Sequence, residues 1–439
     1  MPSKPTTTAT KKEAKPALLP KLRFPDFRGT GAWTTETLGS IARISTEKVG
    51  DKAAIPMSIT SGVGLVSQMN KFGRIIAGSS YANYLLLNKD DFAYNKSATK
   101  EFPEGFIALY SGDELAAVPN SIFTCFRIKG ESPVPQYLNY LFLGNLHGRW
   151  LRKFIEVGAR AHGSLSINEN DLLALPVPLP SGKNSVAEQQ KIAGCLSSVD
   201  DVIAAQARKL DALKTHKKGL MQQLFPREGE TQPRLRFPEF QNVGKWEVRK
   251  LDDLAKRGSG HTPSKSHPEY YNGGIKWVSL ADSKRLDNGL ISETAVEISE
   301  EGIQNSSAVL HPGGTVVISR DAGIGKSAVM SEPMAVSKHF IAWTCKPRLL
   351  SNWFLYHLLQ NTKPHFERAA TGSTIKTIGL QFFADLAFRV PSLSEQQRIA
   401  DCLSSLDKLI DAETKKLEAL RNHKKGLMQQ LFPTPEDLE

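Results

Sequence analysis

Several stretches of this 439-residue chain are rich in side chains that contact nucleic acids. Arginine and lysine bind phosphate oxygens, and several polar side chains also hydrogen-bond to the edges of bases. The candidates in the first half of the chain are Thr60, Ser61, Lys71, Arg74, Tyr94, Asn95, Lys96, Ser97, Arg160, His162 and Ser164. The candidates in the second half are His261, Thr262, Ser264, Lys265, Ser319, Arg320, Lys338, His339, Thr371 and Ser373. Any one of them also fits a solvated turn, so these residues predict DNA binding only as a set.

Motifs that would support catalysis are incomplete. Residues 323–327 (GIGKS) resemble the end of a phosphate-binding loop, but the first glycine that such a loop requires is replaced by Arg320. The ten histidines show no metal-binding spacing, and the four cysteines form no CxxC pair. The Asn/Asp-Pro-Pro-aromatic tetrapeptide of adenine methyltransferases is absent, and no nuclease site is visible. We therefore predict that the chain has no catalytic residues, no metal site and no cofactor of its own.

The chain contains two nearly identical segments of 39 residues, which we call frame 1 and frame 2. Frame 1 is residues 188–226 (EQQKIAGCLSSVDDVIAAQARKLDALKTHKKGLMQQLFP), and frame 2 is residues 395–433 (EQQRIADCLSSLDKLIDAETKKLEALRNHKKGLMQQLFP); 27 of the 39 positions are identical. A leading motif precedes each insert, KLRFPDF at 21–27 and RLRFPEF at 234–240. The inserts between leading motif and frame share little sequence. This pattern indicates that the frames do one common job while the inserts do two different ones.

Both frames are predicted to be long helices. Seam residues alternate at steps of four and three over more than four heptads, from Ile192 to Leu224 and from Ile399 to Leu431, which is typical of a coiled coil. Each helix should end before its Phe-Pro pair, because proline cannot continue a helix. The available N-caps are Ser181 or Ser185 for frame 1 and Ser392 or Ser394 for frame 2.

The two helices can pair with each other in antiparallel direction about a pseudo-twofold axis. Ile192 would then face Leu431, and the seam lysines Lys217 and Lys424 would extend outward towards solvent. The simpler alternative is a helical hairpin that only buries its own seam. Repeated polar residues favour two equivalent docking faces for two copies of one partner. These residues are Glu188, Gln189, Gln190, His216, Lys217, Lys218, Gln222, Gln223 and their copies in frame 2.

Composition fits an ordinary globular protein. The chain is 40% hydrophobic and 23% charged, with a net charge of +11 that permits a polyanionic partner without proving one. No run of about 18 apolar residues and no signal peptide is visible, so we expect a cytoplasmic protein without a membrane span. The inserts mix short strand-like runs such as SIFTCFRI and GTVVISRD with helical stretches at 135–156 and 350–369. Each insert is therefore predicted to be a mixed α/β domain.

The two frames ending in HKKGLMQQLFP, the (K/R)LRFP(D/E)F motif and the duplicated layout resemble the specificity subunits of type I restriction–modification enzymes. The stretch TPSKSHPEYYNGGIKWVSLAD at 262–282 is similar to the start of one common type of target recognition domain. The resemblance spans residues 21–433. It implies two globular target recognition domains joined by two long helices that form an antiparallel coiled coil. It also implies that each domain recognises one half of a bipartite, asymmetric DNA site.

The family resemblance divides the chain into six parts. They are a flexible basic tail (1–20), recognition domain 1 (21–180), spacer helix 1 (181–232), recognition domain 2 (233–391), spacer helix 2 (392–433) and a second tail (434–439). The implied partners are double-stranded DNA, two modification (adenine methyltransferase) subunits and motor–nuclease restriction subunits. S-adenosylmethionine, ATP and magnesium are implied for those subunits only, in DNA methylation and defence against foreign DNA. A protein-interaction scaffold with two unrelated ligand-binding lobes is the alternative function.

Overall fold

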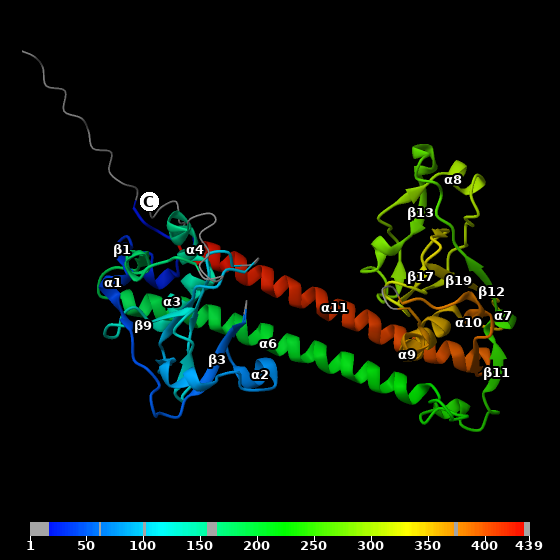
Figure 1. Ribbon diagram of the computed structural model, residues 1–439, viewed down its shortest axis with the longest axis horizontal. Coiled ribbons are helices and arrows are strands. Elements are labelled where there is room, and N and C mark those ends of the chain that lie inside the picture. The colour runs from blue at the N-terminus through cyan, green and yellow to red at the C-terminus, as the bar shows by residue number, and fades with distance from the viewer. Residues whose placement is uncertain (1–16, 61–62, 100–101, 156–164, 373–375, 434–439) are drawn as a thin grey trace, which may run out of the picture. The chain divides into compact units, whose positions relative to one another are not determined.

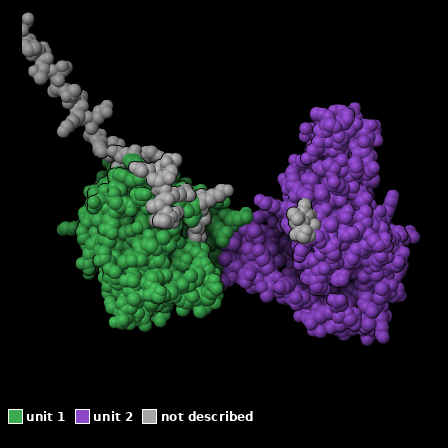
Figure 2. All heavy atoms as spheres, in the orientation of Figure 1, with its two compact units in different colours: residues 1–205, 418–439 green, residues 206–417 purple. Residues whose placement is uncertain are grey.

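The computed structural model describes residues 17–60, 63–99, 102–155, 165–372 and 376–433 (Figure 1). They fall into two compact units (Figure 2). Unit 1 comprises residues up to 205 and from 418 onward, and unit 2 comprises residues 206–417. Each unit therefore contains one insert and parts of both frames. No helix in these described ranges is long and apolar enough to cross a membrane.

Unit 1 contains two four-stranded sheets and a two-stranded ribbon. The first sheet has the order β2 (Ala42–Ser45), β9 (Phe123–Ile128), β6 (Phe92–Asn95), β7 (Phe106–Leu109). The second has the order β4 (Gly64–Ser67), β3 (Ile55–Thr60), β8 (Ala116–Val118), β5 (Leu85–Leu87). The ribbon pairs β1 (Thr34–Thr37) with β10 (Pro176–Leu179). The short helices are α1 (Leu38–Ile41), α2 (Gln68–Phe72), α3 (Pro135–Leu143), α4 (Leu146–Leu151) and α5 (Glu169–Leu173).

Unit 2 contains a five-stranded sheet, a three-stranded sheet and a ribbon. The larger sheet has the order β12 (Ala255–Ser259), β19 (Phe340–Cys345), β16 (Val316–Ser319), β17 (Ser327–Met330), β14 (Leu290–Ile291). The smaller has the order β15 (Glu297–Ile298), β13 (Tyr271–Val278), β18 (Ala335–Val336), and the ribbon pairs β11 (Glu247–Lys250) with β20 (Ala387–Val390). The helices of the insert are α7 (Leu251–Leu254), α8 (Glu300–Gln304), α9 (Asn352–Ala369) and α10 (Leu380–Ala384).

The inserts share a sheet topology that their sequences do not reveal. The order β2-β9-β6-β7 in unit 1 corresponds, strand for strand along the chain, to β12-β19-β16-β17 in unit 2. Along the chain, helix α3 follows β9 and helix α9 follows β19. The last strand of each insert, β10 or β20, then pairs with the first strand after the leading motif, β1 or β11. A sheet requires alternating apolar residues rather than particular ones, so two unlike sequences can specify one topology. The inserts thus differ in sequence but share this architecture.

Each frame forms one long helix, α6 (Ser185–Leu224) and α11 (Leu393–Leu431). Both helices end before their Phe-Pro pairs, as predicted. Ser392 caps α11 through its hydroxyl oxygen, which accepts from the amide of Glu395 at 3.4 Å. Neither predicted serine caps α6, since Ser185 lies in the first turn and its hydroxyl donates to the carbonyl of Pro180 at 2.5 Å.

Within unit 2 the two long helices run antiparallel. Gln206 and Lys209 of α6 contact Glu413 of α11. Lys217, further along α6, pairs with Asp407, which lies earlier in α11. The buried core of this unit includes the C-terminal end of α6 and the N-terminal end of α11, together with residues of the large sheet and helix α9. The antiparallel packing predicted for the seam is therefore present inside this unit.

Unit 1 contains the matching arrangement. Lys424 of α11 pairs with Asp200 of α6 at 2.6 Å, and Ile192 and Leu431 belong to one apolar cluster. The expectation that Lys217 and Lys424 extend to solvent is wrong, because their side chains are only 17% and 18% exposed. An aspartate lies within reach on the facing helix in each case, so an ion pair holds the ammonium group between the helices.

The leading motifs are clamped onto the helices by buried ion pairs. In unit 1, Arg23 donates from Nε and Nη2 to the two carboxylate oxygens of Glu188, both at 2.7 Å. Trp33 donates to the same carboxylate at 3.3 Å. In unit 2, Arg236 and Glu395 form the equivalent pair with the same two distances. Repetition of these residues in the two frames therefore has a structural cause.

Two residues predicted to lie on docking faces are buried instead. Glu188 and Gln189 are 1% and 0% exposed. The side-chain oxygen of Gln189 accepts from the amide of Val134 at 2.8 Å, directly before α3, and Gln396 accepts from the amide of Ser351 at 3.0 Å before α9. These glutamines satisfy helix-end donors that would otherwise be unpaired. Glu188 and Gln189 are therefore not part of an exposed face of the helix.

The predicted tail ends earlier than residue 20. Leu18 is buried in the core of unit 1, and its carbonyl oxygen accepts from the amide of Trp33 at 2.8 Å. Residues 17–20 thus belong to the unit, and the rest of the predicted tail lies outside the described residues.

Two buried histidines predict weaker stability in mild acid. Burial lowers the pKa of His147 to about 4 and that of His357 to about 3, the latter also because Lys217 is near. Both therefore stay neutral in the folded chain while the unfolded chain takes up protons below its ordinary pKa near 6.5. Stability is complete above that pH and falls as the pH is lowered towards the folded pKa. Each histidine should lower the free energy of unfolding by about 2 kcal/mol at pH 5.

Chemical denaturation at pH 7.5 and pH 5 measures this loss. The variant His357→Phe should show a smaller fall for unit 2 between the two pH values than the original chain does. The exposed His216 provides the control, since His216→Gln should leave the pH dependence unchanged. An equal fall in His357→Phe would contradict the assignment.

Candidate nucleic-acid interface

Arg320 lies at the centre of a loop cluster at one end of the large sheet of unit 2. It follows β16 directly, and its backbone amide donates to the carbonyl of His339 at 3.0 Å. Its carbonyl accepts from the amide of Ile378 at 2.8 Å, and its Nε donates to the carbonyl of Ile378 at 3.0 Å. Among the described residues, the terminal guanidinium nitrogens have no hydrogen-bond partner. The backbone of Arg320 is therefore fixed, while two nitrogens remain for a ligand.

Neighbouring loops bring further predicted residues to this place. Asp321 accepts from Nδ1 of His339 at 2.8 Å, so the ring of His339 is oriented by a carboxylate. Thr371 exchanges two backbone hydrogen bonds with Thr377, which also bridges to Asp321. Lys338, beside His339, is exposed. Arg320, Lys338, His339 and Thr371 thus gather from separate parts of the sequence.

The segment after β12 packs against the backbone just before Lys338 and His339. A Cβ atom at Gly260 would lie 1.8 Å from the carbonyl oxygen of Val336, so only glycine permits this contact. The next residue, His261, is exposed, and its carbonyl accepts from the indole of Trp277 at 3.2 Å. The remaining predicted residues of this segment are partly or fully exposed, namely Thr262, Ser264 and Lys265. The segment therefore presents polar groups beside the Arg320 cluster.

Lys96 holds the corresponding position in unit 1. It follows β6 directly, and its amide donates to the carbonyl of Ile122 at 2.9 Å. Its carbonyl accepts from the amide of Leu165 at 2.9 Å. Ile122 precedes β9 as His339 precedes β19, so the same two backbone bonds fix a long cationic residue in each unit. Ser97 lies beside it, partly exposed, with its amide bonded to Asn95.

Three predicted contact residues are buried and cannot reach DNA. Tyr94 is 0% exposed, and its hydroxyl donates to the carbonyl of Glu104 at 2.8 Å. Burial raises the pKa of Tyr94 far above its usual value. Asn95 and Ser319 are 6% and 1% exposed, and their side chains bond to the backbone of the following turns. They shape the loops that carry Lys96 and Arg320, which corrects their predicted role.

A second group of predicted residues in unit 1 lies around the β3–β4 hairpin. Thr60 ends β3 and is partly exposed. Lys71, in α2, donates to the hydroxyl of Ser58 at 3.3 Å and to the carbonyl of Ile59, so it ties α2 to the hairpin. Arg74 is exposed just beyond α2. Five predicted residues lie outside the described ranges: Ser61, Arg160, His162, Ser164 and Ser373.

Comparison with known proteins finds similarity to one family. A family model described as the type I restriction modification DNA specificity domain matches residues 243–422. The type I restriction enzyme MjaIX specificity subunit of Methanocaldococcus jannaschii is 28% identical over 176 residues, which are 40% of this chain and 41% of that protein. The putative MjaX specificity subunit of the same organism is 24% identical over 331 residues, 75% of this chain and 74% of that protein.

This chain is similar to type I specificity subunits. The resemblance predicted from its sequence is confirmed. The crystal structure of a type I S subunit from M. genitalium has the same fold, with a TM-score of 0.58 and 15% identity over 94% of this chain and 99% of that one. The match to the first relative spans less than half of that protein's length.

A second candidate surface lies on the long helices and the leading motifs, and it occurs once in each unit. In unit 2 it borders a hollow of about 440 Å³, and the guanidinium of Arg398 lies 4.5 Å from the centre of the Phe237 ring. In unit 1, Nζ of Lys191 lies 5.8 Å from the ring of Phe24. We call these two patches the frame surfaces. The unit 2 patch also includes His216, Leu220, Asp401, Cys402, Ser405, Leu406 and Leu409.

The frame surfaces expose apolar side chains at equivalent positions of the repeat. Leu409 is 41% exposed in unit 2 and Val202 is 51% exposed in unit 1. Exposed apolar residues beside a cation–aromatic pair are common at protein interfaces. The frame surfaces therefore replace Glu188 and Gln189 as the candidate docking faces.

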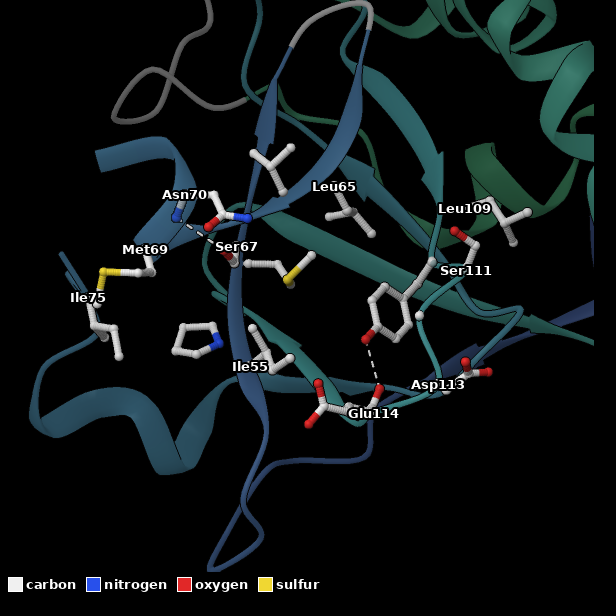
Figure 3. A pocket seen from close by; sticks show the side chains of 15 residues that line it. Ile55, Leu65, Ser67, Met69, Asn70, Ile75, Leu109, Ser111, Asp113 and Glu114 are labelled. Carbon is white, nitrogen blue, oxygen red and sulfur yellow. Dashed lines mark hydrogen bonds between the residues drawn. The ribbon is translucent and has the colours of Figure 1, made fainter. Parts of the chain in front are cut away.

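Structural contacts account for polar side chains in the incomplete phosphate-binding motif and in one cavity of unit 1. Lys326 donates to the carbonyl of Ser283 at 2.9 Å, so it joins the turn between β16 and β17 to the segment that contains Ser283. The cavity, of about 530 Å³, is lined mainly by apolar side chains (Figure 3). Its Ser67 caps α2, and its Asp113 pairs with Lys89 at 2.6 Å. No group of metal-binding side chains occurs within the described ranges.

Proposed function

We propose that this chain is the DNA-recognition subunit of a type I restriction–modification complex. Units 1 and 2 each recognise one half of a bipartite, asymmetric DNA site. The observation that carries the proposal is the equivalent placement of Lys96 and Arg320 in two inserts of common topology and different sequence. A shared scaffold with different side chains around a fixed cation suits two unlike half-sites.

The helices have two roles in this proposal. The antiparallel pairing found within each unit extends along α6 and α11 as one coiled coil, which sets the number of unread base pairs between the half-sites. The two frame surfaces each bind one modification subunit, the adenine methyltransferase, and motor–nuclease subunits complete the restriction complex. S-adenosylmethionine, ATP and magnesium act in those subunits, and this chain alone neither methylates nor cuts DNA. The repetition of Phe24 with Lys191 as Phe237 with Arg398 supports two equivalent docking positions.

Mapping methylated adenines in the source genome, with and without this gene, tests the proposal. We expect one split, non-palindromic motif to lose methylation when the gene is deleted. Duplex binding should also weaken steeply as salt is raised, because phosphate contacts release counterions. An unchanged methylation pattern together with no duplex binding would favour the protein-scaffold alternative.

Variants of the two equivalent cations should separate the half-sites. Arg320→Ala is expected to relax base preference only in the half-site bound by unit 2, by about 1–3 kcal/mol. Lys96→Ala should affect only the other half-site. Binding assays on duplexes with single base-pair changes in either half measure both effects, and each variant is the control for the other. A uniform loss of affinity across all duplexes would instead assign these residues to phosphate contacts.

A further inference from the structure

The paired helices contain a buried polar contact at one particular position of the repeat. Gln206 and Glu413 are equivalent residues of frame 1 and frame 2, and they are only 7% and 8% exposed. Nε2 of Gln206 donates to Oε2 of Glu413 at 2.5 Å and to its backbone carbonyl at 3.1 Å. Lys209 donates to the other carboxylate oxygen. Equivalent positions thus contact each other with unlike side chains.

This is the seam position at which the two frames differ in charge, because Gln206 is neutral and Glu413 carries a carboxylate. Of the ten seam positions, eight carry the same residue in both frames, and another exchanges Val199 for Leu406. Apart from these two exchanges, the seam of α6 therefore offers the same side chains as the seam of α11. Without a distinguishing contact, each helix could pair equally well with its own counterpart in a second copy of this chain.

Pairing of like helices would change this contact in two ways. Two α11 helices in the same register would place Glu413 against Glu413, which brings two carboxylates together in a buried layer. Two α6 helices would place Gln206 against Gln206, which leaves only a neutral amide contact. The mixed pair alone has an amide donor on a carboxylate, and such charge-assisted hydrogen bonds are roughly twice as strong as neutral ones. Buried polar residues fix partner choice in other coiled coils by the same principle.

We propose that Gln206 and Glu413 select the pairing of α6 with α11 over the pairing of like helices from two copies of this chain. The consequence is that the pairing can form within one chain, because each chain contains one α6 and one α11, whereas a pair of like helices requires two chains. This proposal concerns the helices and is independent of what the two units bind. Its tests therefore use no DNA.

The first test compares three full-length chains by thermal unfolding: the original chain, a single variant and a double variant. Gln206→Glu places two carboxylates in the seam and should lower the Tm of the transition that includes unit 2 by about 3–6 °C. The double variant Gln206→Glu with Glu413→Gln exchanges the two side chains and should regain at least half of that loss. Lys416 makes this possible, because it has the same repeat position as Lys209. A double variant no more stable than Gln206→Glu would overturn the proposal.

The second test measures self-association by native mass spectrometry over a concentration series. Glu413→Gln makes the contact Gln–Gln in every pairing, so it removes the preference for the mixed pair. The dissociation constant of its dimer is expected to fall roughly tenfold relative to the original chain. The exchanged double variant should behave like the original chain. An unchanged monomer–dimer equilibrium in Glu413→Gln would show that another contact selects the pairing.

Discussion

Replacing Glu395 with alanine is expected to lower the free energy of unfolding of unit 2 by about 3–5 kcal/mol. The carboxylate is 1% exposed, and it accepts two hydrogen bonds from Arg236 and one from Trp246. Its removal leaves the guanidinium, 11% exposed, without its counter-charge. Since whole domains are stable by only about 5–15 kcal/mol, this is a large fraction of the total.

Differential scanning calorimetry of the full chain measures the effect. Glu395→Ala should lower the transition of unit 2, and Glu188→Ala should lower that of unit 1, because Arg23 and Glu188 form the matching pair. The control is Gln397→Ala, two residues further along the helix but exposed, which should change neither transition. If Glu395→Ala and Gln397→Ala shifted the Tm of unit 2 equally, the ion pair of Arg236 with Glu395 would not be the cause.

A double replacement tests whether charge is the cause. Arg236→Met combined with Glu395→Leu removes both charges and retains apolar volume. The double variant should therefore lower the free energy of unfolding of unit 2 by less than Glu395→Ala alone. A double variant as unstable as the single one would show that the geometry of the clamp, including the bond from Trp246, matters more than the unpaired charge.

The helices could be predicted from the sequence because their signals are local. Steps of four and three residues define the seam, and Phe-Pro defines each end, so the bounds at Leu224 and Leu431 follow from neighbouring residues. The role of Glu188 could not be predicted in this way, because its partner Arg23 lies 165 residues earlier. Repeated glutamate in a helix fits an exposed face as well as a buried ion pair. The useful signal was the co-repetition of arginine in the leading motif.

The candidate interface was predicted in part for a similar reason. Polar residues after strands indicated loops, and the structure does bring Arg320, His339 and Thr371 together. Burial within those loops depends on contacts between distant segments, which residue type does not reveal. Tyr94 illustrates this, since its hydroxyl bonds to a backbone carbonyl inside the core. The equivalence of Lys96 and Arg320 required the backbone hydrogen bonds, because the surrounding sequences differ.

Lengthening both helices by the same amount is expected to widen the unread spacer of the DNA site. Helix α6 has 40 residues and is about 60 Å long at 1.5 Å per residue. Four residues inserted after Ala207 and four after Thr414, at equivalent positions of the repeat, add about 6 Å to each helix. Base pairs are about 3.4 Å apart, so the spacer should grow by one or two base pairs. Both half-sites should stay the same, since neither recognition loop is changed.

Seven-residue insertions at the same two places sharpen the prediction. Seven residues preserve the alternation of four and three, whereas four residues locally disturb it. They add about 10 Å, which corresponds to about three base pairs. A chain with four extra residues in α6 alone is the control, because its seam can no longer align along its whole length and DNA methylation should be lost. Mapping methylated adenines in cells that carry each variant reads out the spacer. An active chain with insertions in both helices and an unchanged spacer would show that the helices do not set the distance.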